Sequence, residues 1–155
     1  MTALSPNAHA PAFTVTGHHG NPVSLADFAG KTLVLYFYPK DDTSGCTSEA
    51  KDFTDLGNEF AAAGATVLGI SKDSVASHCK FIAKYDLSVT LLSDEEGSMC
   101  EAYGVWVEKS MYGKTYMGIE RATFLIDGTG VIQRIWRTVS VKDHATEVLK
   151  AAQEL

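Results

Sequence analysis

The sequence is poor in cysteine, in proline and in net positive charge, and these shortages exclude several classes of protein. Its 155 residues include three cysteines and four prolines. Three widely spaced cysteines cannot all pair within one chain, which argues against a secreted disulfide scaffold. Thirteen basic and nineteen acidic residues give a formal charge of -6, without any basic run. Nucleic acid is therefore not expected as a partner.

Long hydrophobic runs and targeting patterns are also missing. The longest apolar stretch, 33–38, is far shorter than the roughly 20 residues that a membrane helix needs, and residues 1–13 lack a signal-peptide pattern. There is no internal repeat and no glycine-rich phosphate loop. We expect a soluble, cytoplasmic protein with no membrane partner, built as one domain over residues 1–155.

What the sequence does contain is an alternation of strand-like and helix-like segments. Residues 12–16 and 23 flank a turn at 17–21, which predicts an N-terminal β-hairpin. Residues 32–38 are apolar without alternation, as expected of a central strand covered on both faces. The remaining pattern predicts a helix at 46–63, a strand at 66–71, a helix at 74–85, a strand at 89–92, a short helix at 98–103, strands at 122–126 and 131–136 around a turn at 127–130, and a helix at 143–155. This order predicts an α/β fold, a thioredoxin-like three-layer sandwich with a mixed central sheet and an N-terminal β-hairpin extension.

Cys46 is the residue most favourably placed for chemistry. It lies at the predicted start of a helix, directly after the central strand and a polar loop. Unpaired N–H groups and the positive end of the helix dipole favour a thiolate at such a site. Thr43 offers a hydroxyl that either caps the helix or faces the same pocket, and Gly45 allows close approach of the backbone. On spacing alone, an inert buried cysteine beside an ordinary helix cap is an equally good interpretation.

Two acidic residues complicate this electrostatic argument. Asp41 and Asp42 precede Cys46, and anions beside a thiolate disfavour it, so a compensating cation is needed. Arg121 comes immediately before the predicted strand 122–126, where its guanidinium, which never deprotonates, can reach the mouth of a pocket. The alternative for Arg121 is a solvated arginine at the edge of a strand.

The run Tyr-Pro-Lys-Asp-Asp-Thr-Ser-Gly-Cys-Thr at 38–47 resembles the active-site signature of peroxiredoxins, P-x-x-x-[TS]-x-x-C. The similarity covers nearly the whole chain, and the segments 92–97 and 111–121 resemble the peroxiredoxin Q branch, also called bacterioferritin comigratory protein. The resemblance implies a thiol-dependent peroxidase that reduces hydrogen peroxide and organic hydroperoxides in antioxidant defence. It also implies that no metal or organic cofactor is needed.

The resemblance also assigns roles to individual residues. It implies that Pro39 shields the pocket, that Thr43 hydrogen-bonds the peroxide, and that Cys46 is the peroxidatic cysteine, which becomes a sulfenic acid. Arg121 would hold the thiolate and the peroxide, and Glu49, in the predicted first turn, would orient Arg121 by a bidentate contact. A thiol must then reduce the sulfenic acid. The sequence leaves thioredoxin, glutaredoxin with glutathione and other small thiols open as that reductant. The resemblance favours thioredoxin, and a monomer as the oligomeric state.

The resolving cysteine is where the sequence departs from the family pattern. Many members carry it five residues after the peroxidatic cysteine, where this chain has Lys51. Others carry it on the following helix, near Ile82 here, and Cys79 lies one turn before that position on the same helical face. Cys79 is therefore a candidate resolving cysteine. Its alternative is a small apolar residue packed on the buried face with Val75, Ile82 and Tyr85, and the enzyme would then use one cysteine and an external thiol.

Other interpretations rest on the remaining cysteines and histidines. Cys100 is expected to have no catalytic duty. A thiol-disulfide oxidoreductase usually needs C-x-x-C, but Thr47, Ser48 and Glu49 follow Cys46. A metal-binding or redox-sensing protein would need a ligand spacing that is not present.

We assign no role to the five histidines His9, His18, His19, His78 and His144, which are expected at the surface or in ordinary packing. The aromatic residues Trp106, Tyr112 and Tyr116 are expected either to line a hydrophobic entrance or to pack the loop before Arg121, and packing is favoured.

Overall fold

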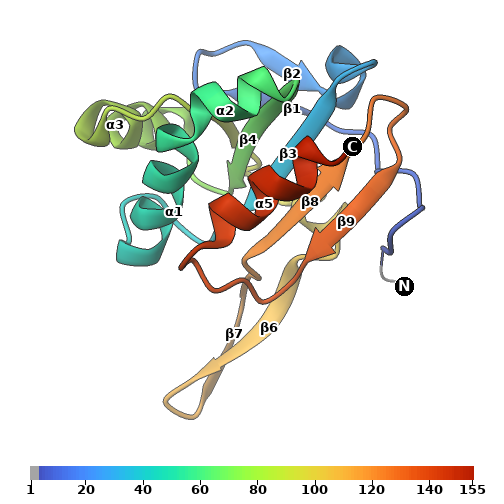
Figure 1. Ribbon diagram of the computed structural model, residues 1–155. Coiled ribbons are helices and arrows are strands. Elements are labelled where there is room, and N and C mark those ends of the chain that lie inside the picture. Colours follow the sequence, from blue (N-terminus) through green and yellow to red (C-terminus); the bar gives the residue numbers. More distant parts are fainter. Residues whose placement is uncertain (1–3) are drawn as a thin grey trace.

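The computed structural model describes residues 4–155, in which a seven-stranded mixed sheet is covered by helices (Figure 1). The strands lie in the order β2-β1-β5-β4-β3-β8-β9. Their bounds are β1 Thr14–Gly17, β2 Pro22–Ser24, β3 Thr32–Phe37, β4 Ala65–Ser71, β5 Thr90–Ser93, β8 Ala122–Ile126 and β9 Ile132–Trp136. The neighbours β3, β4 and β5 run parallel, and the other neighbouring pairs are antiparallel. The predicted mixed sheet and the N-terminal hairpin of β1 and β2 are therefore confirmed.

Helices cover both faces of this sheet. On one face lie α1 (Ser44–Asp55), α2 (Gly57–Ala62), α3 (Val75–Tyr85) and α5 (His144–Gln153), and on the other α4 (Ser98–Ala102) and the 3-10 helix η1 (Leu25–Phe28). Alternate side chains of β3 supply both cores: Val34 and Tyr36 pack toward α1, whereas Leu35 and Phe37 pack toward α4. All of these strand residues are fully buried, which confirms the predicted central strand. Within residues 4–155, no helix has the length and apolar character needed to cross a bilayer.

The helix that contains Cys46 differs from its predicted bounds. It begins at Ser44, because Thr43 has the extended backbone of an N-cap residue (φ -96°, ψ 157°). It also ends at Asp55, and a second helix starts at Gly57. Leu56 between them has φ -94° and ψ 8°, which breaks the regular helix. Cys46 is therefore the third residue of α1 rather than its first.

A second sheet was not predicted from the sequence. It is a hairpin of β6 (Trp106–Met111) and β7 (Lys114–Ile119), which extends away from the main sheet (Figure 1). Its two-residue turn, Tyr112 and Gly113, has φ values of 53° and 77°. Both values are positive, as a type I′ turn requires, but a tyrosine at the first position hides the usual Asn-Gly or Asp-Gly signal.

The aromatic residues of this hairpin do not pack as expected. Tyr112 is 97% exposed and Tyr116 is 45% exposed, so the packing interpretation is wrong for both. Trp106, at the base of the hairpin, is half-buried, and the ammonium of Lys72 lies 4.1 Å from its ring centroid. The packing prediction therefore holds only where the hairpin joins the main body.

Candidate active site

Cys46 lies where the central strand, a short loop and a helix meet. It follows β3 by nine residues and occupies the first turn of α1, where the leading N–H groups have no acceptor within the helix. Its residue exposure is 1%, and it packs in the core between the sheet and the helices. This location places the sulfur close to the positive end of the helix dipole and to the unpaired N–H groups.

Arg121 bridges Cys46 and Glu49. Its Nη2 donates a hydrogen bond to Cys46 Sγ at 3.2 Å, and its Nη1 donates to Glu49 Oε1 at 2.6 Å. The Arg121 side chain is 17% exposed and that of Glu49 is 1% exposed. A side-chain carbon at position 45 would lie 3.3 Å from Arg121 Nη2, so Gly45 leaves room for the guanidinium. The structure therefore brings the predicted cation into contact with the sulfur.

The predicted bidentate contact between Glu49 and Arg121 is wrong. Each terminal nitrogen of Arg121 serves a different partner, because the second one is directed at Cys46. Glu49 Oε2 is buried without a hydrogen-bond partner among residues 4–155. Glu49 also lies in the second turn of α1, since the helix begins at Ser44 rather than at Cys46.

Burial shapes the ionisation of both groups in this pair. Desolvation raises the pKa of Glu49 to about 7, although the charge and hydrogen bond of Arg121 act in the opposite direction. Burial alone would lower the pKa of Arg121, but Glu49 and Cys46 outweigh it and raise that pKa above its usual range. Arg121 therefore stays charged, whereas Glu49 changes its charge near neutral pH.

The loop before α1 carries the two other predicted site residues. Pro39 follows β3 and is exposed, and Thr43 is the exposed N-cap residue. Thr43 Oγ1 donates to the carbonyl oxygen of Lys40 at 2.9 Å and makes no capping hydrogen bond to α1. The interpretation of Thr43 as a side-chain cap is therefore wrong, and its oxygen lone pairs are left to accept a hydrogen bond from another group.

The two aspartates of this loop contact side chains on α3. Asp41 Oδ2 lies 2.7 Å from His78 Nδ1, and Asp42 Oδ2 accepts from Lys84 Nζ at 2.8 Å. The hydrogen bonds from Lys84 and from Tyr85 lower the pKa of Asp42. The two carboxylates that would disfavour a thiolate at Cys46 therefore contact side chains of α3.

The other two cysteines have contrasting environments. Cys79 on α3 is exposed, and its Sγ donates to the carbonyl oxygen of His18 at 3.2 Å. The interpretation of Cys79 as a buried apolar residue is wrong, because His78 and Phe81 form the buried face of α3 and place Cys79 beside the β1–β2 turn. Cys100 is fully buried, and burial together with Asp94 raises its pKa far above the usual range. Cys100 therefore remains an unreactive thiol.

Two histidines form buried polar contacts that sequence reasoning left without a role. His78 is 0% exposed and lies between Asp41 and the carbonyl oxygen of Leu92, while His144 Nε2 lies 2.8 Å from Thr123 Oγ1. One available signal was the helical spacing of His78 and Phe81, which puts this histidine at the centre of the apolar face of α3.

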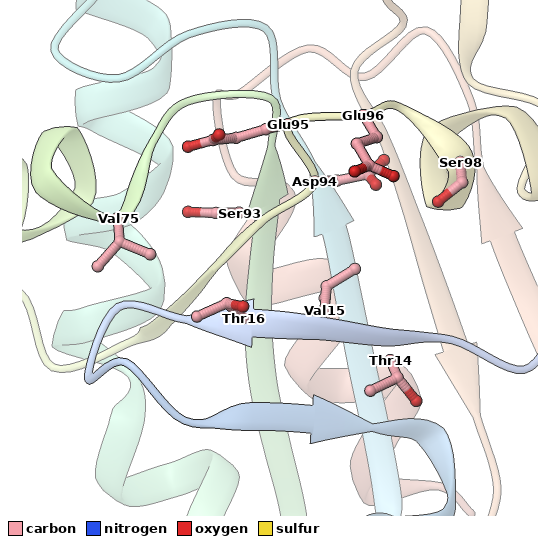
Figure 2. Close-up of a pocket in the computed structure, with 9 residues that line it drawn as sticks. All are labelled: Thr14, Val15, Thr16, Val75, Ser93, Asp94, Glu95, Glu96 and Ser98. Carbon is pink, nitrogen blue, oxygen red and sulfur yellow. The ribbon is translucent and has the colours of Figure 1, made fainter.

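A cavity of about 370 Å³ lies away from this site, between β1 and the segment that follows β5 (Figure 2). It is lined by Thr14, Val15, Thr16, Val75, Ser93, Asp94, Glu95, Glu96 and Ser98, and contains none of the candidate site residues. Asp94 uses both carboxylate oxygens to accept N–H groups of Met99 and Cys100 at the start of α4. Across the described residues, no group of three or more His, Cys, Asp or Glu side chains is arranged to hold a metal ion. The candidate site is therefore the group of residues around Cys46, with Arg121 and Glu49.

Comparison with known proteins agrees with this geometry. Residues 6–135 match the model of the AhpC/TSA family. The chain is 54% identical over 140 residues to the putative peroxiredoxin bcp of Coxiella burnetii, which covers 90% of this chain and 93% of that protein. The chain belongs to the peroxiredoxin family. It is also 49% identical over 146 residues to the peroxiredoxin Bcp of Bacillus subtilis, covering 94% of this chain and 93% of that protein.

Solved peroxiredoxins share the whole fold. Peroxiredoxin Q of Xanthomonas campestris has a TM-score of 0.88 and 46% identity, covering 92% of this chain and 90% of that one. A cysteine-to-serine mutant of PrxQ from Xylella fastidiosa has a TM-score of 0.94 and 38% identity, covering 99% of this chain and 98% of that one. These likenesses confirm the predicted thioredoxin-like fold and the peroxiredoxin Q branch. The peroxiredoxin is thus a thiol-dependent peroxidase, which uses a hydroperoxide and a thiol reductant.

Proposed function

We propose that Cys46 is the peroxidatic cysteine and that Arg121 is the cation that activates it. The observation that carries this proposal is the hydrogen bond from Arg121 Nη2 to Cys46 Sγ at 3.2 Å, in a buried helix start. Arg121 is charged at any pH at which the enzyme works, and its second nitrogen is fixed by Glu49. The guanidinium therefore stabilises a thiolate, and its contact with Glu49 keeps it in position beside the sulfur.

The reaction follows from these contacts. The Cys46 thiolate attacks one peroxide oxygen, the O–O bond breaks, and the sulfur becomes a sulfenic acid while the other oxygen leaves as an alcohol or water after taking a proton. Arg121 stabilises the charge that develops on the oxygens. Thr43 accepts a hydrogen bond from the peroxide through the lone pairs left free by its bond to Lys40. Pro39 shields the opening of the pocket.

Both hydrogen peroxide and organic hydroperoxides are proposed as substrates. Alkyl peroxide reduction activity is described for the bacterioferritin comigratory protein of Xanthomonas campestris, which is 45% identical to this chain with a TM-score of 0.88. The 1% exposure of Cys46 supports a substrate that reaches the sulfur through its small hydroperoxide end.

For the return to the thiol we propose Cys79 as the resolving cysteine. It is the exposed thiol of the chain, whereas Cys100 is buried. A disulfide needs Cα atoms within about 7 Å, and Cys46 contacts Arg121 while Cys79 contacts His18. The first turn of α1 would therefore unwind during each cycle, and thioredoxin would reduce the disulfide. The competing route is direct reduction of the Cys46 sulfenic acid by an external thiol.

We further propose that the enzyme acts as a cytoplasmic monomer without nucleic acid or membrane partners. Its acidic balance of thirteen basic to nineteen acidic residues supports the exclusion of nucleic acid.

The test compares cysteine variants in peroxide consumption with a thiol reductant. Cys46→Ser should abolish consumption, and Cys100→Ser, the matched control for a buried cysteine, should retain it. Mass analysis of the unmodified enzyme after one equivalent of hydrogen peroxide then separates the two reduction routes. A crosslinked Cys46–Cys79 peptide supports Cys79 as the resolving cysteine, whereas a trapped Cys46 sulfenic acid without a crosslink refutes it. Activity retained by Cys46→Ser would overturn the whole proposal.

A further inference from the structure

The loop between β3 and α1 is attached to α3 through the side-chain contacts of two consecutive aspartates. Asp41 contacts His78 and also accepts from Ser77 Oγ at 2.8 Å, and Asp42 is paired with Lys84. All three partners belong to α3, which lies on the same face of the sheet as α1 (Figure 1). The backbone N–H of Asp41 is also bound, because it donates to Asp73 Oδ2 at 2.8 Å. The position of the loop is therefore set by α3 and by the segment just before it.

His78 is the buried centre of this attachment. Its Nδ1 lies 2.7 Å from Asp41 Oδ2, and its Nε2 lies 3.0 Å from the carbonyl oxygen of Leu92. A carbonyl oxygen can only accept, so Nε2 carries a proton. Asp41 also accepts from the hydroxyl of Tyr38 at 2.6 Å, and its residue exposure is 7%. The Asp41 carboxylate thus contacts three side chains, those of Tyr38, Ser77 and His78.

The short distance along the chain makes this attachment relevant to catalysis. Thr43 lies two residues after Asp41, and Cys46 lies five residues after it. Between them, Asp42 has φ of 59°, a left-handed conformation that costs energy in a residue other than glycine and is maintained here by its contacts with α3. The Thr43 side chain donates to the carbonyl of Lys40, and the Thr43 carbonyl oxygen accepts from Thr47 N of α1 at 2.8 Å. The bond to Lys40 by itself thus does not direct Thr43 Oγ1 toward Cys46.

We propose that His78 is a positioning residue for peroxide reduction, which acts through Asp41 to hold Thr43 and the first turn of α1 around Cys46. The inference rests on the proposed roles of Cys46 and Thr43, and it adds a residue that touches neither the sulfur nor the substrate. Without the imidazole, the Asp41 carboxylate is buried with fewer donors, and the loop moves to regain them. A displacement of about 1 Å at a reacting group can slow a reaction by about 100-fold.

The experiment measures how fast Cys46 is oxidised by hydrogen peroxide in a single turnover, by stopped flow, with mass analysis of the sulfur product. His78→Gln should lower this rate constant by about 10- to 100-fold. Ser77→Ala removes one donor to Asp41 with little change of shape and should give a smaller loss. The double variant Asp41→Asn/His78→Gln, which removes the buried carboxylate together with the imidazole, should be oxidised faster than His78→Gln alone.

A local readout separates positioning from general destabilisation. Hydrogen exchange of the amides at 39–45 should accelerate in His78→Gln while those of β8 stay protected. The matched control is His144→Gln, another buried histidine, which contacts Thr123 and not the loop. It should leave both the exchange at 39–45 and the oxidation rate constant unchanged.

Two results would overturn the inference. One is an unchanged oxidation rate constant in folded His78→Gln and Ser77→Ala. The other is a loss of rate that His144→Gln shares to the same extent, which would mean that any buried histidine matters equally. If His78→Gln fails to fold, Ser77→Ala carries the test alone. The proposed function fails separately, through peroxidase activity in Cys46→Ser.

Discussion

Replacing Arg121 with lysine separates the charge of the guanidinium from its shape. The two terminal nitrogens of Arg121 hold Cys46 Sγ at 3.2 Å and Glu49 Oε1 at 2.6 Å at the same time. A lysine ammonium is a single point of charge on a flexible stem, and it cannot reproduce both contacts from the same backbone position. Arg121→Lys therefore keeps the positive charge but loses one charge-assisted hydrogen bond.

The size of the effect follows from that lost bond. A hydrogen bond to a charged group is worth about 1.5–3 kcal/mol, and about 1.4 kcal/mol corresponds to a tenfold change in rate. If lysine keeps its contact with Glu49, the rate constant for oxidation of Cys46 should fall by about 10- to 150-fold. Arg121→Met should lower both the rate constant and the stability of the fold, because it also leaves Glu49 without its cation. The Glu49 side chain is 1% exposed. Breaking a buried pair in this way typically destabilises a protein by about 3–5 kcal/mol.

Stopped-flow oxidation by hydrogen peroxide and urea denaturation measure these two quantities separately. The control is the double variant Arg121→Met/Glu49→Gln, which removes the unpaired carboxylate and should regain stability without regaining rate. A wild-type rate constant in Arg121→Lys would refute the reasoning, since the fork geometry would then contribute nothing. Recovery of rate in the double variant would equally refute it, because the charge would not be needed.

Two further predictions concern stability as a function of pH. Glu49 has its pKa raised to about 7 by burial, so the folded state favours its neutral form, and the stability that this gives at low pH is lost as the pH rises through 7. The pKa difference corresponds to a decline of about 3 kcal/mol in the free energy of unfolding. Urea titrations of Glu49→Gln at several pH values should show no such decline. An unchanged decline in this variant would contradict the prediction. Burial lowers the pKa of His144 to about 4, so its stability contribution is present above about 6.5 and is lost as the pH falls toward 4. His144→Gln should therefore flatten the acid side of the stability curve, whereas an equally steep acid loss in this variant would show that His144 is not responsible.

Local features of this fold could be predicted from the sequence because their causes are local. The unbroken apolar run of β3 required burial on both faces, and Asp127 with Gly128 marked the turn between β8 and β9. In the structure Asp127 Oδ1 accepts from Thr129 N at 2.9 Å and from Val131 N at 3.1 Å, which explains the strength of that signal. The placement of Cys46 after β3 followed from the same kind of argument, since a strand, a polar loop and a helical pattern meet there.

The features that escaped prediction depend on partners far away in the sequence. His78 occupies a buried helical position because Asp41, 37 residues earlier, lies within hydrogen-bond distance of its Nδ1. A histidine is ordinarily counted as a surface residue, so the pattern of α3 was interpreted with Cys79 on the buried face instead. The division of Arg121 between two partners likewise depends on Cys46, 75 residues away. Spacing predicts which face of an element is buried, but not which polar group on that face finds a partner.

These long-range contacts place opposing demands on the start of α1. In the proposed mechanism, Cys46 stays in contact with Arg121 during peroxide reduction while Asp41 holds the preceding loop against α3. The proposed internal disulfide with Cys79 would unwind the same turn, because Cys46 is buried beside Arg121 whereas Cys79 is exposed beside His18. The contacts of Arg121 and of His78 would then favour the first step and oppose the second. A one-cysteine route has no such conflict, since an external thiol can reduce the sulfenic acid while α1 stays folded. The state of Cys79 after oxidation therefore decides whether the attachment of the loop to α3 is permanent or is broken in every cycle.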